Sequence, residues 1–149
     1  MYKKILYEDL VKIFDLHRKY LAGEDDGVRA ELSGGDFYGT DFSNVNLAGA
    51  NLEATSFKRS NVMGINLEGA NLKAANMKRA CFANANLKKA NMEGTFLKGC
   101  NFDEADLRGT NLKGASLEDA YFGNAYYDKD TVWPDGFDPV AAGARLVEK

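Results

Sequence analysis

Large apolar residues recur at every fifth position through most of the chain. The period runs without a slip over residues 30–124, which comprise 19 pentads, and the central residue of every pentad is apolar. A five-residue step rotates by about 140° round an α-helix and changes face along a flat strand, so neither structure would gather these side chains into one core. The spacing therefore predicts a solenoid whose chain bends at every pentad and whose central side chains point inward. Between residues 65 and 90 the central residues are Leu67, Leu72, Met77, Phe82 and Leu87.

Individual pentads such as ANLKA, ANLEA, ADLRG and TNLKG resemble the units of the pentapeptide repeat family. The resemblance covers about two thirds of the chain. It implies an all-β fold, a right-handed quadrilateral β-helix with four pentads in each coil. The 19 pentads of residues 30–124 would then make about 4.75 coils. The resemblance also implies that the central residue and the residue two places before it face inward. The segments that flank the repeats look like those of bacterial members, including cyanobacterial ones.

Asparagine or aspartate usually stands just before the central residue, as at Asn66, Asn71 and Asp106. These short side chains bond neighbouring backbone groups in turns, and stacked amides can form ladders between coils. We therefore interpret them as structural residues.

The N-terminal segment is expected to cover one open end of the solenoid, where backbone and apolar core would otherwise be exposed. Apolar residues at helical spacing predict a helix from about Glu8 to Ala22. Residues 1–23 are thus expected to form a capping helix and residues 24–29 a polar connector. The apolar face would consist of Leu6, Leu10, Ile13, Phe14, His17 and Leu21.

Residues 125–149 are expected to form a C-terminal cap or tail. Asp138 and Pro139 suit the start of a helix, so a short helix from about Pro139 to Val147 is predicted, although Gly143 disfavours it. The alternative is a dimer interface, as in the gyrase-inhibiting members of the family that the chain resembles; a monomer is favoured. The aromatic residues that could cover the last coil are Tyr126, Tyr127, Trp133 and Phe137.

The sequence contains little that suggests catalysis. His17 is the only histidine, and no Ser/His/Asp set, Cys/His pair or zinc-ligand spacing is evident. Cys81 is expected to face outward and Cys100 inward, so the two should not form a disulfide. We predict that the protein is not an enzyme and that it uses no cofactor or metal.

Composition narrows the class of protein further. A net charge of −3 over 149 residues is unlike a basic nucleic-acid-binding chain. The N-terminus lacks the continuous apolar run of a secretory signal, and no segment has the length of a membrane span. Two cysteines suit a reducing compartment. We expect a cytoplasmic protein that does not associate with a membrane.

One outward-facing set of residues is uniformly basic and repeats at the coil spacing of twenty. Stacked like charges repel one another, so this stripe is the best candidate for a contact surface. The alternative is a solvated surface that only keeps the protein soluble. The members of the stripe are Lys58, Arg59, Lys78, Arg79 and Lys98, and Phe96 is a nearby exposed apolar residue.

These features favour a non-catalytic protein-interaction module, of a regulatory kind, that binds an unidentified protein partner through an outer face. A first alternative is a DNA-mimicking inhibitor or protector of gyrase, as found in the family that the chain resembles. Residues 30–124 carry 11 acidic and 10 basic residues, and the basic stripe has the wrong sign for a duplex mimic. A second alternative is nucleic-acid binding through the stripe, which we regard as less favoured than a protein partner.

Overall fold

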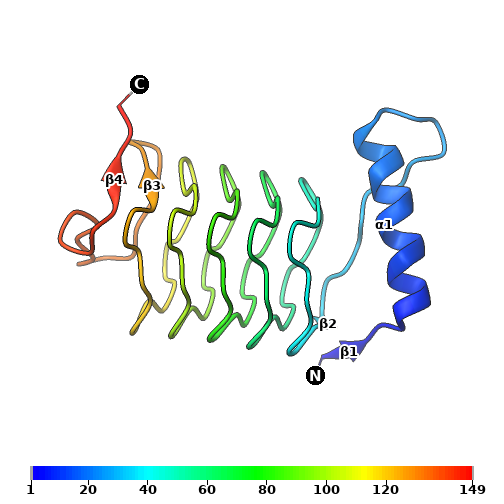
Figure 1. Ribbon diagram of the computed structural model, residues 1–149, viewed down its shortest axis with the longest axis horizontal. Helices are drawn as coiled ribbons and strands as arrows, with labels where there is room; N and C mark the ends of the chain where they lie inside the picture. Colours follow the sequence, from blue (N-terminus) through cyan, green and yellow to red (C-terminus); the bar gives the residue numbers. More distant parts are fainter. Residues whose placement is uncertain (1, 149) are drawn as a thin grey trace.

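The computed structural model describes residues 2–148 as a rod of stacked coils with a helix at its N-terminal end (Figure 1). Between β2 and β3 the coils are joined by isolated parallel bridges, because each pentad contributes one paired residue before the chain turns. The helix and strands in chain order are β1 (Lys3–Lys4), α1 (Tyr7–Leu21), β2 (Gly35–Asp36), β3 (Tyr126–Tyr127) and β4 (Arg145–Leu146).

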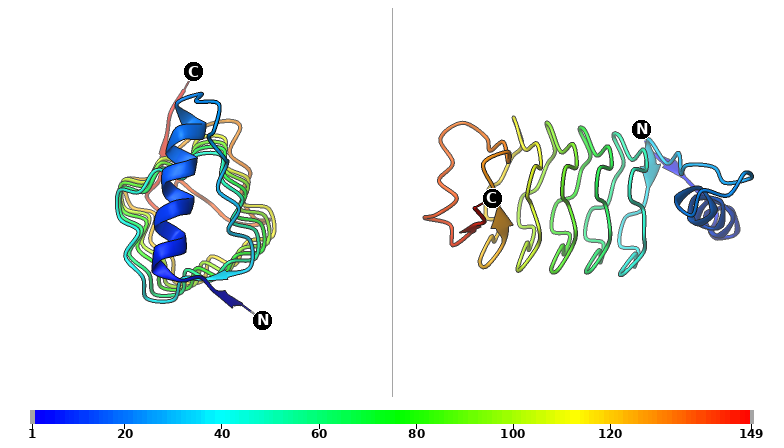
Figure 2. Two further views of the ribbon diagram at one scale, coloured as in Figure 1. Left: turned by 90° about the vertical axis from the view of Figure 1, so that its right-hand side faces the viewer. Right: turned by 90° about the horizontal axis from the view of Figure 1, so that it is seen from above.

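Successive coils pair at a spacing of twenty residues. Asn51 pairs with Glu31 in the preceding coil and with Asn71 in the next. Leu52 donates its N–H to the carbonyl of Asn71 at 2.7 Å, and Asn71 donates its own N–H to Ala50 at 3.0 Å. Four such bridges recur in each twenty residues, and the coils superimpose when the rod is viewed from its end (Figure 2). The backbone therefore satisfies its hydrogen bonds between coils instead of within long strands.

The core fills the inside of the coils. Every central pentad residue is buried except Leu117, which is partly exposed in the last coil. Phe82, Phe102 and Phe122 stack in one column with ring centroids 5.1 and 4.9 Å apart and nearly parallel planes. Small residues such as Ala70, two places before a central residue, are also buried. The predicted inward orientation of both positions agrees with the structure.

Each pentad ends in a turn whose second residue has a left-handed backbone. The φ angle two places after every central residue lies between 57° and 72°. Ten of these residues are not glycine, and a left-handed conformation costs an ordinary residue roughly 1–2 kcal/mol. This requirement was not recognised from the sequence, although glycine and asparagine are frequent at the position.

The asparagine and aspartate side chains before the central residues hold the turns. Asn71 accepts the N–H of Lys73 at 3.1 Å, and Asp41 accepts that of Ser43 at 2.9 Å. Thus the structural interpretation is correct. The expected amide ladder is largely missing: among residues 2–148 one asparagine side chain bonds another, Asn71 to Asn51 at 3.3 Å.

Helix α1 crosses the N-terminal end of the rod (Figure 2). It begins and ends within one residue of the predicted bounds, and acidic residues in its first turn and basic residues in its last complement the helix dipole. Leu10 and His17 are buried, but Leu6 and Leu21, which we expected on the same face, are 62% and 41% exposed. The helix therefore covers the end of the core only in part.

The predicted C-terminal helix from Pro139 to Val147 is wrong. Asp138 does cap a turn, because its carboxylate accepts the N–H groups of Val140 and Ala141. Gly143 then adopts a φ of 90°, which a right-handed helix does not allow. The chain instead forms β4, which pairs in parallel with β3 and continues the ladder between coils.

The aromatic residues of the tail cover the last coil, as the sequence indicated. Trp133 meets the ring of Phe122 edge-on at 5.5 Å and that of Tyr127 at 5.6 Å. Phe137 stacks on Trp133 at 4.9 Å. These rings extend the phenylalanine column past the end of the coils.

Candidate functional site

The side chains of His17 and Cys100 are bonded within the fold. Within residues 2–148 no three histidine, cysteine, aspartate or glutamate side chains are grouped so that they could hold a metal ion. In the same range no helix combines the length and the apolar character that crossing a bilayer requires. The candidate site is therefore on the outer surface.

His17 fastens α1 to the first coil. Its Nδ1 accepts the N–H of Ala30 at 2.9 Å, so the proton lies on Nε2, which donates to the carbonyl of Ala48 at 2.9 Å. Burial lowers the pKa of the imidazole, although the Ala48 bond opposes the shift. A buried neutral ring with both nitrogens bonded is a structural histidine, as the sequence indicated.

The two cysteines are free and differ in exposure. Cys100 is buried and its thiol donates to the carbonyl of Met77 at 2.7 Å, while Cys81 is partly exposed. Burial raises the pKa of the Cys100 thiol to about 12, which keeps it from acting as a nucleophile.

The predicted basic stripe lies at a corner of the rod. Each of its members occupies one of the two turn positions that follow a central residue, so the cations project where the coil bends and not from a flat side. We call this set the basic corner. Its residues are Lys58, Arg59, Lys78, Arg79 and Lys98.

The basic corner is a rigid and only partly neutralised column. Arg59 donates its backbone N–H to the carbonyl of Lys78, and Arg79 donates to Lys98, both at 2.9 Å, so the coil ladder fixes the spacing. Lys98 lies 3.8 Å from Glu118, the one ion pair that the corner makes within residues 2–148.

Phe96 is the apolar residue of the candidate surface. It occupies a bridge position on a side of the coil and is 44% exposed. The ammonium of Lys78 lies over its ring, 5.9 Å from the centroid. The structure thus places Phe96 beside the basic corner, as predicted from the sequence.

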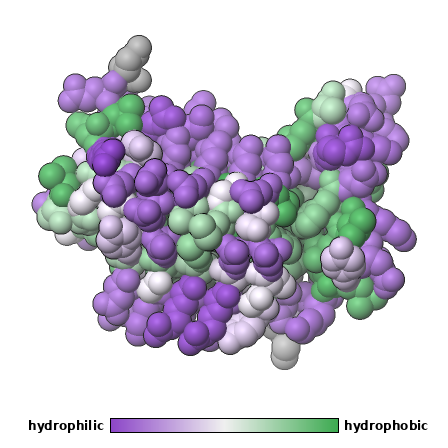
Figure 3. Space-filling view, in the orientation of Figure 1, coloured by the Kyte–Doolittle hydropathy of each residue, from purple (hydrophilic) through white to green (hydrophobic). Residues whose placement is uncertain are grey.

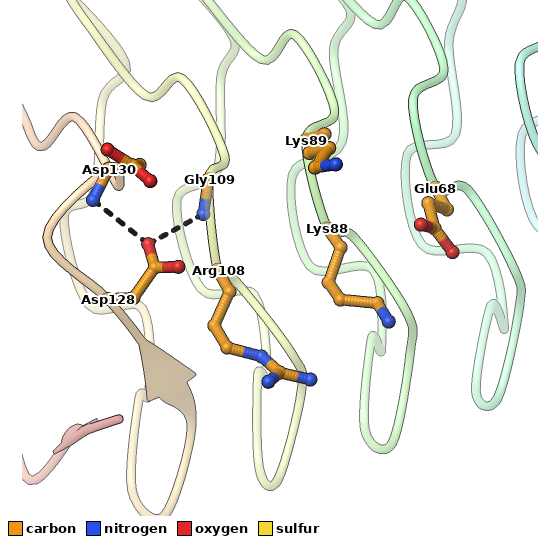
Figure 4. Close-up of a pocket in the computed structure, with 7 residues that line it drawn as sticks. All are labelled: Glu68, Lys88, Lys89, Arg108, Gly109, Asp128 and Asp130. Carbon is orange, nitrogen blue, oxygen red and sulfur yellow. Dashed lines mark hydrogen bonds between the residues drawn. The ribbon is translucent and has the colours of Figure 1, made fainter. Parts of the chain in front are cut away.

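A second group of cations lies two pentads away, at the opposite corner. Lys88, Lys89 and Arg108 line a shallow hollow of about 360 Å³ together with Glu68 and Asp128 (Figure 4). Half a coil separates this group from the basic corner, so the two do not form one continuous surface.

Acidic residues line the same hollow as this second group, and Asp106 pairs with Arg108. Partial burial of Asp106 opposes its ionisation, but hydrogen bonds from Arg108 outweigh that effect and hold the pKa of Asp106 below its usual value. Asp128 accepts the N–H groups of Gly109 and Asp130, each at 3.0 Å (Figure 4). The role of Asp128 was missed, although its spacing to Thr131 is typical of a side-chain turn. The basic corner is therefore the stronger candidate surface.

Comparison with known proteins identifies the repeats. The family profile described as pentapeptide repeats matches eight copies, at residues 28–62, 50–88 and 80–119. A search of curated protein sequences finds no match to the chain.

Three solved structures are similar to this chain. A pentapeptide repeat protein from the Arabidopsis thaliana thylakoid lumen is 26% identical over 62% of this chain and 68% of its own, with a TM-score of 0.53. One from the cyanobacterium Cyanothece 51142 is 30% identical over 79% of this chain and 96% of its own, with a TM-score of 0.40. The plasmid-mediated fluoroquinolone resistance protein QnrB1 is 20% identical over 80% of this chain and 63% of its own, with a TM-score of 0.39.

The family match and the Arabidopsis structure imply a right-handed β-helix solenoid, in agreement with the fold class that the resemblance implied. The thylakoid location belongs to the Arabidopsis protein alone, so the cytoplasmic location expected from the sequence stays a prediction. With eight matched copies spanning residues 28–119, the chain belongs to the pentapeptide repeat family.

Proposed function

We propose that the protein is a non-catalytic interaction module that binds a partner protein through the basic corner. The observation that supports this most is the uncompensated charge. Lys58, Arg59, Lys78 and Arg79 form no ion pair within residues 2–148, although they repeat over successive coils. Exposed charge of one sign at fixed spacing attracts an opposite surface and steers its approach.

The chemistry of the corner defines the partner class. An acidic patch that carries one apolar side chain would neutralise the cations and cover Phe96. Because the coil ladder already fixes the backbone at Arg59 and Arg79, binding would order side chains but not backbone, which limits the conformational entropy lost on binding.

Charge reversal tests this function. Proteins captured from a host lysate by the wild type would be compared with those captured by Lys58→Glu/Lys78→Glu/Lys98→Glu. The control Lys73→Glu/Lys113→Glu/Lys129→Glu changes the net charge equally, at exposed lysines outside the corner. We expect the first variant to lose a partner that the control retains. Equal recovery by all three proteins would show that the corner is not the binding surface.

The two alternatives predict different results. A gyrase inhibitor should block supercoiling by purified gyrase, whereas we expect no inhibition at micromolar protein, because the corner is positive. A nucleic-acid-binding protein should shift duplex or single strands with an affinity that falls steeply with salt. We expect no salt-sensitive shift.

We also propose that the protein is a monomer. Segments of the chain itself lie over both ends of the rod, α1 at one end and Trp133 with Phe137 at the other. Light scattering behind a sizing column should give the mass of one chain, 16.4 kDa, and twice that mass would favour the dimer through the C-terminal tail.

A further inference from the structure

The first coil has an unpaired edge beside α1. Each bridge residue directs both its N–H and its C=O toward the coil on its N-terminal side. Asn61, for example, bonds Thr40 and Phe42 of the preceding coil. The corresponding groups of Asp41 and Asn46 point toward the N-terminal end, where they have no hydrogen-bond partner in residues 2–148.

On the neighbouring side of the same coil, a strand already pairs with the corresponding edge. There β1 pairs in parallel with β2, Lys3 with Gly35 and Lys4 with Asp36, so the chain's own extended segment occupies the edge. After β1 the chain leaves the edge and forms α1. The unpaired edge at Asp41 is therefore the continuation of the edge to which β1 is already paired.

An apolar groove runs between this edge and α1. A hollow of about 390 Å³ is lined by Tyr7, Val11 and Phe14 of the helix and by Phe42 of the coil. A second hollow of about 460 Å³ shares Phe14 and continues to Leu21 and Val45.

The helix side of this groove is open to solvent. Tyr7 is 82% exposed and Val11 48%. Apolar surface gathers around α1 in the space-filling view (Figure 3).

The negative charge of Asp41 at the rim of the groove favours a ligand that carries a basic residue. Asp41 lies at the edge, is exposed, and forms no ion pair within the described range 2–148. Hydrogen bonds from Ser43 hold the pKa of Asp41 below its usual value, so the carboxylate is ionised near neutral pH. Arg18, the one cation of the second hollow, is already paired with Asp15 at 2.9 Å.

We propose that this edge and groove form a second docking site, which binds an extended segment of another protein by strand addition. The segment would pair its backbone with Asp41 in the manner of β1. It would insert a large apolar side chain between α1 and Phe42, and place a lysine or arginine against the Asp41 carboxylate. This site is at the end of the rod and is independent of the basic corner.

The test uses phage-displayed random heptapeptides selected on the full chain, with Val11→Lys as the comparison target. We expect enriched peptides that combine a large apolar residue with a neighbouring basic residue, and no enrichment on Val11→Lys. Val28→Lys is the matched control, since Val28 is an exposed valine outside the groove and this variant should select the same peptides. Lack of enrichment on the wild type, or equal enrichment on Val11→Lys, would overturn the proposal.

The best synthetic peptide then tests the backbone pairing. Asp41→Pro removes an N–H that bonds nothing in the fold, and proline is tolerated at strand edges. It also removes the carboxylate, so the reference is Asp41→Ala, which loses the carboxylate but keeps the N–H. We expect Asp41→Pro to bind about tenfold more weakly than Asp41→Ala. A peptide methylated on alternate backbone nitrogens should also lose binding, and equally tight binding of that analogue would refute strand addition even if Asp41→Pro failed to fold. The triple glutamate variant of the basic corner should bind the peptide normally, which separates this site from the proposed function.

Discussion

Each end of the rod would expose unpaired backbone and apolar core, and the two ends are covered in different ways. At the N-terminal end a helix lies across the first coil, is fastened by His17, and leaves an edge open at Asp41. At the C-terminal end the tail continues the coil ladder through β4 and covers the core with Trp133 and Phe137. A helix therefore covers apolar surface but cannot pair an edge, whereas a strand with aromatic side chains does both.

The largest expected effect is at the aromatic end. Trp133→Ala removes ring contacts with Phe122, Tyr127 and Phe137 and should lower the free energy of unfolding by about 3 kcal/mol. Phe14→Ala, which loses one ring contact, with Phe42, should cost about 1–2 kcal/mol. Urea denaturation measures both, and a larger loss at Phe14 would reverse the ranking of the two ends.

Trp133→Phe provides the control for this experiment. It keeps an aromatic ring and removes an indole N–H that is buried without a partner in residues 2–148. Because an unpaired buried donor is itself unfavourable, the cost should be below about 1 kcal/mol.

Gly143→Ala tests whether the C-terminal cap is a strand or a helix. In the structure Gly143 has a φ of 90°, so an alanine should destabilise the protein by about 1–2 kcal/mol. In a helix the same change would stabilise it by about 1 kcal/mol. The sign of the shift in a thermal melt therefore decides between the two structures.

Lowering the pH should destabilise the N-terminal end of the rod more than the C-terminal end. Burial places the folded pKa of His17 below the unfolded value near 6.5, so the unfolded chain binds more protons as the pH falls through that range. The stability contributed by His17 is thus complete above pH 6.5 and decreases below it. Protonation would also set an N–H of the ring against the N–H of Ala30, and the nearby Arg29 adds repulsion.

Hydrogen exchange measures this effect. Between pH 7 and pH 5, after correction for intrinsic rates, the amide of Ala30 should lose protection while that of Arg145 in β4 keeps it. His17→Gln, which can still accept and donate one hydrogen bond each, should remove the difference between the ends. Equal loss at both ends in the wild type would contradict the role of His17.

What could be predicted from the sequence depended on periodicity. The spacing of five identified the core, from Leu32 to Phe122, because one apolar residue per pentad leaves no other way to gather the side chains. The helical spacing before Gly23 identified α1 in the same way. The tail has no repeat, so local preferences at Asp138 and Pro139 predicted a helix, whereas pairing with β3 decided the outcome.

The surface was harder to predict for a related reason. Repeat spacing placed the basic residues in one column, but it could not tell a corner from a side, because that depends on which pentad positions form the turn. The open edge at Asp41 was not foreseen, since it depends on where the chain leaves β1 and on how α1 crosses the end. Both features follow from coil geometry and not from residue type.

The smallest expected effect concerns the turns that separate the two ends. Ala74 has a φ of 61° in the middle of the rod, where an L-residue is strained by roughly 1–2 kcal/mol. Ala74→Gly relieves that strain but increases the entropy of the unfolded chain, so a net gain of about 0.5 kcal/mol is expected in urea denaturation. The reverse change, Gly69→Ala, has open space for the new methyl group and should cost about 1 kcal/mol through its φ of 69° alone. A loss of stability in Ala74→Gly, or a gain in Gly69→Ala, would show that the left-handed turns impose no strain on the rod.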